Sequence, residues 1–250
     1  MARTVNVAER AARRDWILDA TQRLILSKGY ERLTIQDILD DLHISKGAFY
    51  HYFDSKSAVI AALTTRLVGE SERNLAPIVE NPEMRALEKL QLFFGEIVRF
   101  KSARQKLLVA MLAHWYAAEN TAFRELVDRE TTERLAPLLG AIVRQGVDEH
   151  RFATDYPEQA GAIIFAVVQA LQDTIAEQLL AAARRSSSAL DVSDLVNTHG
   201  AHIEAIERYL GVPAGTLHRA DGGVVKSWVT ALRRANNASV DSFPSGLLRN

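Results

Sequence analysis

Apolar and polar residues recur along this chain with the 3.6-residue period of amphipathic helices, and the period-two alternation of β-strands is almost absent. We expect Pro77 and Pro82 to end the helix that follows residue 56. The pattern predicts further helices over 83–101, 104–116, 119–146, 156–185 and 190–211. Residues 184–194 form the clearest internal loop, and within the turn-rich stretch 213–250 only 224–234 is typical of a helix. The sequence therefore predicts an all-α fold.

Two short helices are predicted within residues 34–53, TIQDILDDLHISKGAFYHYF. Thr34 is a typical N-cap, and Asp37 three residues later can complete a weak capping box. The first helix then places apolar residues at helical spacing, namely Ile35, Ile38, Leu39 and Leu42. Ser45 is typical of an N-cap for the second helix, so only His43 and Ile44 are left for the turn. This spacing predicts a helix-turn-helix.

The second helix has one aromatic side and one side that is left free. Phe49, Tyr52 and Phe53 fall together, whereas Lys46, Gly47, Tyr50 and His51 fall opposite. The aromatic side is expected to pack against the protein. The free side suits a DNA duplex, although a small surface hairpin whose Lys and His side chains are merely solvated would show the same pattern.

Each residue on the free side has a chemistry that fits DNA. Lys46 and His51 can reach phosphates or base acceptors, and the Tyr50 hydroxyl can donate to a phosphate oxygen. Gly47 and Ala48 let the helix approach closely, and the Ala48 methyl can contact thymine. Gln36 on the first helix can bond a base edge or the DNA backbone.

These residues carry a resemblance to the tetracycline-repressor (TetR) family of bacterial regulators. The matching positions are Ile17, Ala20, Leu24, Gly29, Tyr30, Thr34, Ile38, Ser45, Gly47, Tyr50, Tyr52 and Phe53, followed by Asp54, Ser55 and Lys56. The resemblance is local to about the first 60 residues. It departs from the family at Leu39 and Leu42, where the family prefers alanine, and at His43, where the family has the turn glycine. His43 is therefore expected at positive φ, which histidine adopts more often than most residues.

The resemblance implies an N-terminal three-helix DNA-binding domain over residues 1–55 and a larger helical effector-binding and dimerisation domain over 56–212. Residues 213–250 would then be a basic tail of open role and order. The family places Lys56 at the start of a fourth helix, where it touches phosphate, although an ordinary solvated lysine is an alternative. The predicted DNA-binding residues are Thr34, Gln36, Ser45, Lys46, Gly47, Ala48, Tyr50, His51 and Lys56.

Composition and charge fit a regulator kept in the cytoplasm. The 250 residues are 48% hydrophobic, include no cysteine and begin with no signal-peptide core, so we expect a soluble, unexported protein without disulfides or thiolate metal sites. The net charge is −1, and residues 1–56 hold nine basic against eight acidic residues. The first 14 residues carry Arg3, Arg10, Arg13 and Arg14 against Glu9 alone. This is either an arm that follows DNA or a solvated terminus.

The resemblance also implies that two long C-terminal helices pair with those of a second subunit. By position these are 156–185 and 190–211, whose apolar faces are alternatively just intramolecular core. The predicted interface residues are Ile164, Val167, Leu171, Ile175, Ile203, Ile206 and Leu210. A two-fold symmetric operator needs a two-fold symmetric protein, which favours a homodimer.

Aromatic residues gather in the middle helices, where members of the family enclose an effector pocket. The predicted lining is Phe94, Phe100, Met111, His114, Trp115, Phe123 and Phe165, with Phe93 nearby, and it implies a largely apolar small molecule. Simple core packing is the alternative for each of them. His199 and His202 lie three apart on a helix, but no third ligand accompanies them, so no metal or other cofactor is expected.

The sequence thus favours a homodimeric, ligand-responsive transcriptional repressor that binds a palindromic operator in double-stranded DNA. An architectural DNA-binding protein of the same fold, without small-molecule control, is the alternative. Catalysis is not expected, because the chain has no glycine-rich phosphate loop, nucleophile elbow or paired carboxylates.

Overall fold

Helices account for nearly all of the chain in the computed structural model, which describes residues 2–117, 120–184 and 192–240. No β-strand occurs within these ranges, which confirms the all-α fold class. Most of the loop predicted at 184–194, and the last ten residues of the tail, lie outside the described residues.

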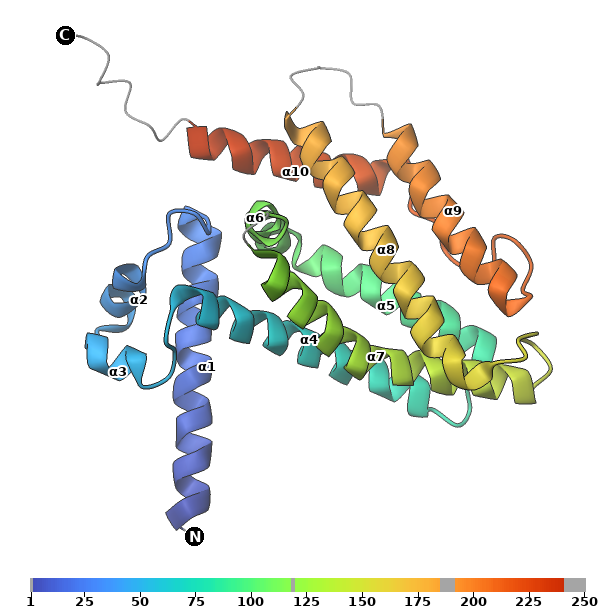
Figure 1. Cartoon of the computed structure of the whole chain (residues 1–250), viewed down its shortest axis with the longest axis horizontal. Coiled ribbons are helices and arrows are strands. Elements are labelled where there is room, and N and C mark those ends of the chain that lie inside the picture. The colour runs from blue at the N-terminus through green and yellow to red at the C-terminus, as the bar shows by residue number, and fades with distance from the viewer. Residues whose placement is uncertain (1, 118–119, 185–191, 241–250) are drawn as a thin grey trace.

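The first three helices are α1 (Ala2–Lys28), α2 (Ile35–Leu42) and α3 (Lys46–Tyr50), and they stand at one end of the molecule in Figure 1. Their apolar sides meet in a shared core that includes Leu18, Ile38 and Phe49, all fully buried. The basic residues at the start of the chain belong to the first turns of α1, so they do not form an extended arm.

Helix α4 (Lys56–Glu80) leaves this unit and runs into the rest of the protein (Figure 1). We expected Pro77 to end this helix, but Pro77 lies inside it and the helix continues to Glu80. A proline this close to the C-terminus removes a single backbone hydrogen bond, which the last turn tolerates. The helix stops at Asn81, directly before Pro82.

Five helices follow at nearly the predicted positions: α5 (Ala86–Ala103), α6 (Gln105–Trp115), α7 (Thr121–Asp148), α8 (Pro157–Arg184) and α9 (Ser193–Leu210). A second core joins the end of α4 to α5, α7, α8 and α9 around Leu90, Phe93, Leu139 and Ile206. The backbones of α7 and α8 lie close together at Gly161. There the position of a Cβ atom would lie only 2.2 Å from the Ala136 carbonyl oxygen.

The tail forms a longer helix than predicted, α10 (Gly222–Val240), which packs against α6, α8 and α9. Asp221 caps it, since its Oδ1 accepts a hydrogen bond from the Val224 amide at 2.8 Å. The segment that leads into α10 is also fixed, because the Leu217 amide donates to the buried carboxylate of Glu207 at 2.8 Å. Residues 213–240 are therefore part of the folded body.

Helix α8 is unusually apolar for its degree of burial. Among the described residues, the stretch Pro157–Ala183 is the one helix that is long and apolar enough to cross a membrane, and only 28% of its most apolar window is buried. A single helix of this kind is weak evidence for a membrane span. Its polar residues Gln172 and Asp173 also bond to other helices of the protein.

Candidate nucleic-acid interface

The turn between α2 and α3 has the geometry that its sequence predicts. The Asp37 amide donates to Thr34 Oγ1 at 3.2 Å, and the Thr34 amide donates to Asp37 Oδ2 at 2.8 Å, so the capping box is complete. His43 ends α2 with φ of 52°, which confirms the expected left-handed conformation. Glycine is the residue that usually adopts this conformation at a turn. His43 adopts it here instead, so the turn between α2 and α3 stays tight.

The capping carboxylate also fixes α2 against the end of α1. Lys28 Nζ lies 2.5 Å from Asp37 Oδ1. The hydrogen bond from Lys28, followed by those from Thr34, lowers the pKa of Asp37 to about 2. The carboxylate therefore stays ionised at any physiological pH and holds the two helices together.

Helix α3 is anchored by one residue and presents the others to solvent. The Ser45 hydroxyl accepts a hydrogen bond from the Ala48 amide at 3.2 Å, which confirms Ser45 as the N-cap. Phe49 is fully buried, whereas the exposed residues are Lys46, Gly47, Ala48, Tyr50 and His51. The predicted division into a packed and a free side is therefore confirmed.

Gly47 is not required by the packing of α3. A Cβ at this position would meet only Ser45 Oγ, at 3.9 Å. Glycine weakens a helix relative to alanine by about 1 kcal/mol, so the fold alone would favour alanine here. A glycine on the solvent side instead permits close approach by a molecule outside the protein.

Polar groups of the other predicted DNA-binding residues already have partners within the chain. Gln36 Nε2 donates to Asp40 Oδ1 at 2.7 Å on the exposed side of α2. Lys56 Nζ donates to the Tyr30 carbonyl at 2.8 Å and lies 3.9 Å from the centre of the Tyr30 ring. Burial lowers the pKa of Lys56. The phosphate contact that the resemblance implies for Lys56 stays a prediction, and in the structure Lys56 joins the start of α4 to Tyr30, which follows α1.

Basic residues of α1 extend the exposed surface of α3. Arg10 and Arg13 line a surface pocket together with Glu9, His51 and Tyr52. The basic segment predicted from the sequence therefore lies next to the C-terminal end of α3. The side chain of Arg3 lies outside the described residues.

The aromatic residues predicted to line one effector pocket are divided between two cores. Phe100, Met111, Trp115 and Phe123 belong with the core around α1–α4, whereas Phe94 and Phe165 belong with the second core. Trp115 and Phe123 pack edge to face, with ring centres 5.3 Å apart. These six residues therefore do not form one apolar group, because their helices face different cores, and the effector pocket stays a prediction.

His114 connects α6 to the DNA-binding unit. Its ring stacks on Tyr30 with 3.8 Å between ring centres, and Asn120 Nδ2 lies 3.0 Å from its Nδ1. Tyr30 is in turn held by Lys56. Since Tyr30 follows α1, this stack is a direct contact between the helical body and the helix-turn-helix.

A group of polar side chains inside the helical body was missed by the sequence reading. We call it the polar cluster; its members are Lys101, Tyr116, Asp128, Gln169, Gln172 and Asp173. Lys101 donates to Gln172, and the Tyr116 hydroxyl donates to Asp173 at 3.0 Å. Burial raises the pKa of Tyr116 and of Asp128, and the charge of Asp173 adds to both shifts. Three helices and the residue after α6 supply these side chains, so no local sequence signal could reveal them.

Lys101 is expected to make stability depend on alkaline pH. Burial lowers its pKa from 10.5 to about 8. Between these pH values the unfolded chain still binds a proton that the folded chain has lost, so the free energy of unfolding rises with pH. Lys101→Met should remove this rise and stabilise the protein near pH 7 by about 1 to 3 kcal/mol.

Urea unfolding followed by circular dichroism at pH 7, 8.5 and 10 measures this effect. Lys106→Met is a matched control, since Lys106 is exposed on α6. If Lys101→Met and the parent protein gave the same pH dependence, the assigned burial of Lys101 would be wrong.

Most of the predicted dimer residues are already buried inside the chain. Ile164, Leu171, Ile203, Ile206 and Leu210 are each at most 8% exposed, and only Val167 and Ile175 are partly buried. The five buried residues leave no surface for a partner subunit, so that part of the prediction is corrected. In the middle of α8 the exposed residues are instead Ala162, Ile163, Ala166 and Ala170. Toward its ends Glu158, Gln159, Glu177 and Ala181 are also exposed, and the exposed residues on α9 include Asn197, Ala201 and Ala205.

The paired histidines of α9 have roles in hydrogen bonding. His199 Nδ1 accepts a hydrogen bond from the Ala220 amide at 3.2 Å, and His202 Nδ1 lies 2.8 Å from the Thr198 carbonyl. Across the described part of the chain, no three His, Cys, Asp or Glu side chains are grouped so that they could hold a metal ion.

Comparison with known proteins finds a matching family profile and similar regulators. Residues 17–63 match the profile described as bacterial regulatory proteins, tetR family. An uncharacterized HTH-type transcriptional regulator in the lacX 3' region of Lactococcus lactis subsp. lactis is 30% identical over 142 residues, which cover 52% of this chain and 72% of that protein. The HTH-type transcriptional repressor KstR of Rhodococcus jostii (strain RHA1) is 26% identical over 182 residues, 73% of this chain and 78% of KstR.

Solved structures share the fold. A TetR transcription regulator from Haloarcula marismortui superposes with a TM-score of 0.57 at 21% identity, over 80% of this chain and 97% of that one. RolR, solved in complex with resorcinol, gives a TM-score of 0.56 at 15% identity, over 90% of this chain and 96% of RolR. The exposed helix α3, its capped turn and these relatives together show that the chain belongs to the tetR family of bacterial regulatory proteins and is a DNA-binding transcriptional regulator.

Proposed function

We propose that this protein is a cytoplasmic, homodimeric repressor that binds a palindromic operator and releases it when a small molecule occupies the helical body. The observation that carries the proposal is helix α3, which buries Phe49 and exposes its other four residues, with the exposed His51 directly after it. A helix of five residues has too little surface to add much to a core. Its exposed side is suited to reading a major groove.

The proposed DNA contacts follow from exposure. Lys46, Tyr50 and His51 bind phosphates or base acceptors, while Gly47 and Ala48 allow the helix to lie close to the bases. Arg10 and Arg13 of α1 add phosphate contacts next to them. Thr34, Ser45 and Gln36 position the two helices, and Lys56 fixes α4 to Tyr30.

The proposed dimer interface is the exposed face of α8 and α9, which we call the α8–α9 face: Ala162, Ile163, Ala166, Ala170, Ala201 and Ala205. Small side chains let helices from two subunits approach closely. A face this apolar on a poorly buried helix is typical of a surface that another protein covers. A two-fold axis through it would present two α3 helices to one operator.

The proposed effector site is the polar cluster together with the apolar side chains around it. Ionisable groups held in partly buried surroundings are typical of ligand sites. RolR, a protein of the same fold, was solved with resorcinol, a small aromatic molecule with two hydroxyl groups. We therefore propose an effector that is largely apolar and carries at least one group able to hydrogen-bond to Lys101, Tyr116 or Asp128.

Release of DNA follows from geometry. Two recognition helices must lie about 34 to 36 Å apart to enter successive major grooves. A ligand between α5, α7 and α8 can shift α6, whose His114 stacks on Tyr30 beside the helix-turn-helix. A coupling of about 1 to 3 kcal/mol would change operator affinity by about 5- to 150-fold.

The test is selection of bound sequences from a random duplex pool with purified protein, followed by titration at two salt concentrations. We expect a two-fold symmetric motif that is bound tightly. Salt-sensitive binding without any motif would contradict the proposal and favour an architectural protein that binds many sites.

Tyr50→Ala is expected to weaken operator binding without unfolding the protein. Tyr50 is 41% exposed, so its removal costs little packing, but the hydroxyl would be lost from both halves of the operator. Hydrogen bonds to charged groups are worth about 1.5 to 3 kcal/mol, so the loss should be on the order of 10- to 100-fold.

Fluorescence anisotropy with the selected duplex measures the change. Tyr156→Ala is the matched control, because Tyr156 is 66% exposed and lies between α7 and α8, outside the proposed DNA contacts. Equal affinity of Tyr50→Ala and the control would count against α3 as the reading helix.

A further inference from the structure

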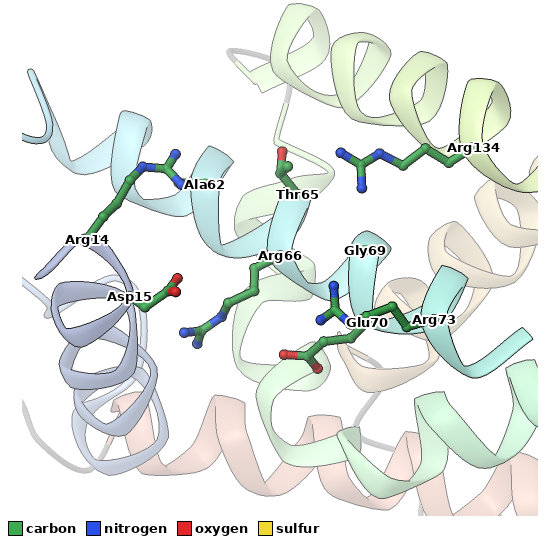
Figure 2. Close-up of a pocket in the computed structure, with 9 residues that line it drawn as sticks. All are labelled: Arg14, Asp15, Ala62, Thr65, Arg66, Gly69, Glu70, Arg73 and Arg134. Atoms are coloured by element: carbon green, nitrogen blue, oxygen red, sulfur yellow. The ribbon is translucent and has the colours of Figure 1, made fainter. Parts of the chain in front are cut away.

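Four arginines line a surface pocket of about 330 Å³ that lies where α4 passes α1 and α7. Figure 2 shows Arg14 on α1, Arg66 and Arg73 on α4, and Arg134 on α7, around the bare backbone of Gly69. None of these residues takes part in the proposed DNA contacts or in the polar cluster. The pocket joins the helix that begins the DNA-binding unit to two helices of the body.

Two guanidinium groups converge at the centre of this pocket. Measured from the point where a Cβ of Gly69 would lie, Arg134 Nη1 is 3.1 Å away and Arg73 Nη1 is 3.5 Å away. Like charges this close repel each other unless an anion lies between or beside them. Because residue 69 has no side chain, the space beside them stays open.

The acidic residues near these two arginines pair with Arg134 and leave Arg73 without a partner. Arg134 is held by Glu130 at 3.0 Å and Glu72 at 3.4 Å. Arg73 is exposed, and its guanidinium has no hydrogen bond or ion pair to any residue that the structure describes. It is therefore free to bind a ligand beside Arg134.

The opposite wall of the pocket also has donor groups without partners. Arg66 pairs with Asp19 at 2.7 Å, yet its buried Nε has no hydrogen-bond partner among the described residues. Arg14 lies over the Phe53 ring at 5.2 Å and has no acidic partner there either.

The two carboxylates of the lining do not pair with the two free arginines. Glu70 is already paired to Arg104, directly after α5, at 2.7 Å, and Asp15 has no ion pair among the described residues. Arg14 and Arg73 therefore keep forked donor groups without a carboxylate partner, which suit an oxyanion with several acceptor oxygens.

We propose that this pocket binds a small molecule bearing phosphate or carboxylate groups, and that its occupancy changes the affinity for DNA. Arg73 and Arg134 hold one oxyanion group, and Arg14 and Arg66 hold the end of the ligand nearer α1. Such a ligand bridges α1 to α4 and α7, so it fixes the orientation of the helix-turn-helix relative to the body. The binding step stands by itself, whereas the change in DNA affinity rests on the proposed function.

Isothermal titration calorimetry with the full-length protein tests the binding step. The probes are pyrophosphate and citrate at constant ionic strength, with chloride as the blank, and they separate phosphate from carboxylate chemistry. We expect one saturable site per chain for at least one probe. Arg73→Gln should weaken it about tenfold or more, and Arg134→Gln likewise.

Arg73→Gln is the decisive variant, since Arg73 has no partner in the described chain and its loss removes no ion pair. Arg144→Gln is the matched control, because Arg144 also lies on α7 but pairs with Glu158 at 3.2 Å, away from the pocket. No saturable heat, or equal binding by the parent protein and Arg73→Gln, would overturn the proposed site.

Operator affinity with and without the bound probe, at matched ionic strength, tests the regulatory step. We expect a shift of about fivefold or more in the parent protein and none in Arg73→Gln. Binding without any shift would overturn the regulatory role while leaving the site. A weaker affinity of Arg73→Gln for DNA in the absence of probe would show that the pocket holds DNA phosphate, and would overturn the proposal. Failure to select any operator would contradict the proposed function, and calorimetry would still decide the site.

Discussion

Replacing Ala166 with glutamate is expected to separate the proposed dimer and to lower operator affinity by about 100-fold or more. Ala166 is exposed on α8, between Ile163 and Ala170 on the α8–α9 face. In a closely packed helix bundle, two glutamates related by the two-fold axis would be buried without partners. An uncompensated buried charge costs about 3 to 5 kcal/mol, which weakens the dimer. A monomer can contact only one half of a palindromic operator, so the affinity for the operator falls as well.

Light scattering during size-exclusion chromatography, together with anisotropy on the selected duplex, measures both effects. Ala122→Glu is the matched control, since Ala122 is exposed near the N-terminus of α7, where an acidic residue is tolerated. If Ala166→Glu remained dimeric with unchanged operator affinity, the interface would lie elsewhere.

Helix α8 shows where a sequence pattern is ambiguous, because the helix is apolar on more than one side. Helix α8 has apolar residues on most of its circumference, so Ile163 and Ile164 look equivalent in the sequence. They point about 100° apart on the helix. In the structure Ile164 is 1% exposed and Ile163 is 42% exposed. The hydrophobic periodicity predicted helix α8, but it did not indicate which apolar side of the helix packs against the rest of the chain.

The helix-turn-helix was predictable because its determinants are local. Thr34, Asp37 and Ser45 act within three residues of themselves, and the left-handed His43 follows from the two-residue turn. Spacing alone placed Phe49 on the packed side, together with Tyr52 and Phe53. Local hydrogen bonds of this kind are encoded by short motifs, so one sequence is enough to read them.

The polar cluster and the arginine-lined pocket were not predictable, because their members meet only after folding. Lys101 and Gln172 are 71 positions apart, and Arg134 and Glu72 are 62 apart. On its own helix each of these residues looks like an ordinary surface residue. The end of the chain gave a partial signal: 224–234 was recognised as helical, and packing against α6 and α8 extends that helix to Gly222–Val240.

Replacing Gly161 with alanine is expected to destabilise the protein by about 3 kcal/mol or more and to lower its Tm by about 10 °C. The added Cβ would lie 2.2 Å from the Ala136 carbonyl oxygen and 2.7 Å from the Gly140 amide nitrogen. Both are backbone atoms of α7, so no side-chain rotation relieves the clash. The long contact between α7 and α8 would have to open, and with it the core around Leu139 and Ile164.

Thermal unfolding followed by circular dichroism measures this loss, and Gly95→Ala is its matched control. Gly95 is exposed in the middle of α5, and a Cβ there would meet nothing within 4 Å. That change should stabilise the protein by up to about 1 kcal/mol, because alanine is the better helix former. The two substitutions are expected to change the stability in opposite directions. The comparison therefore distinguishes the effect of a backbone clash from the effect of helix propensity. If both variants raised the Tm, the two helices would not approach as closely at Gly161 as the structure places them.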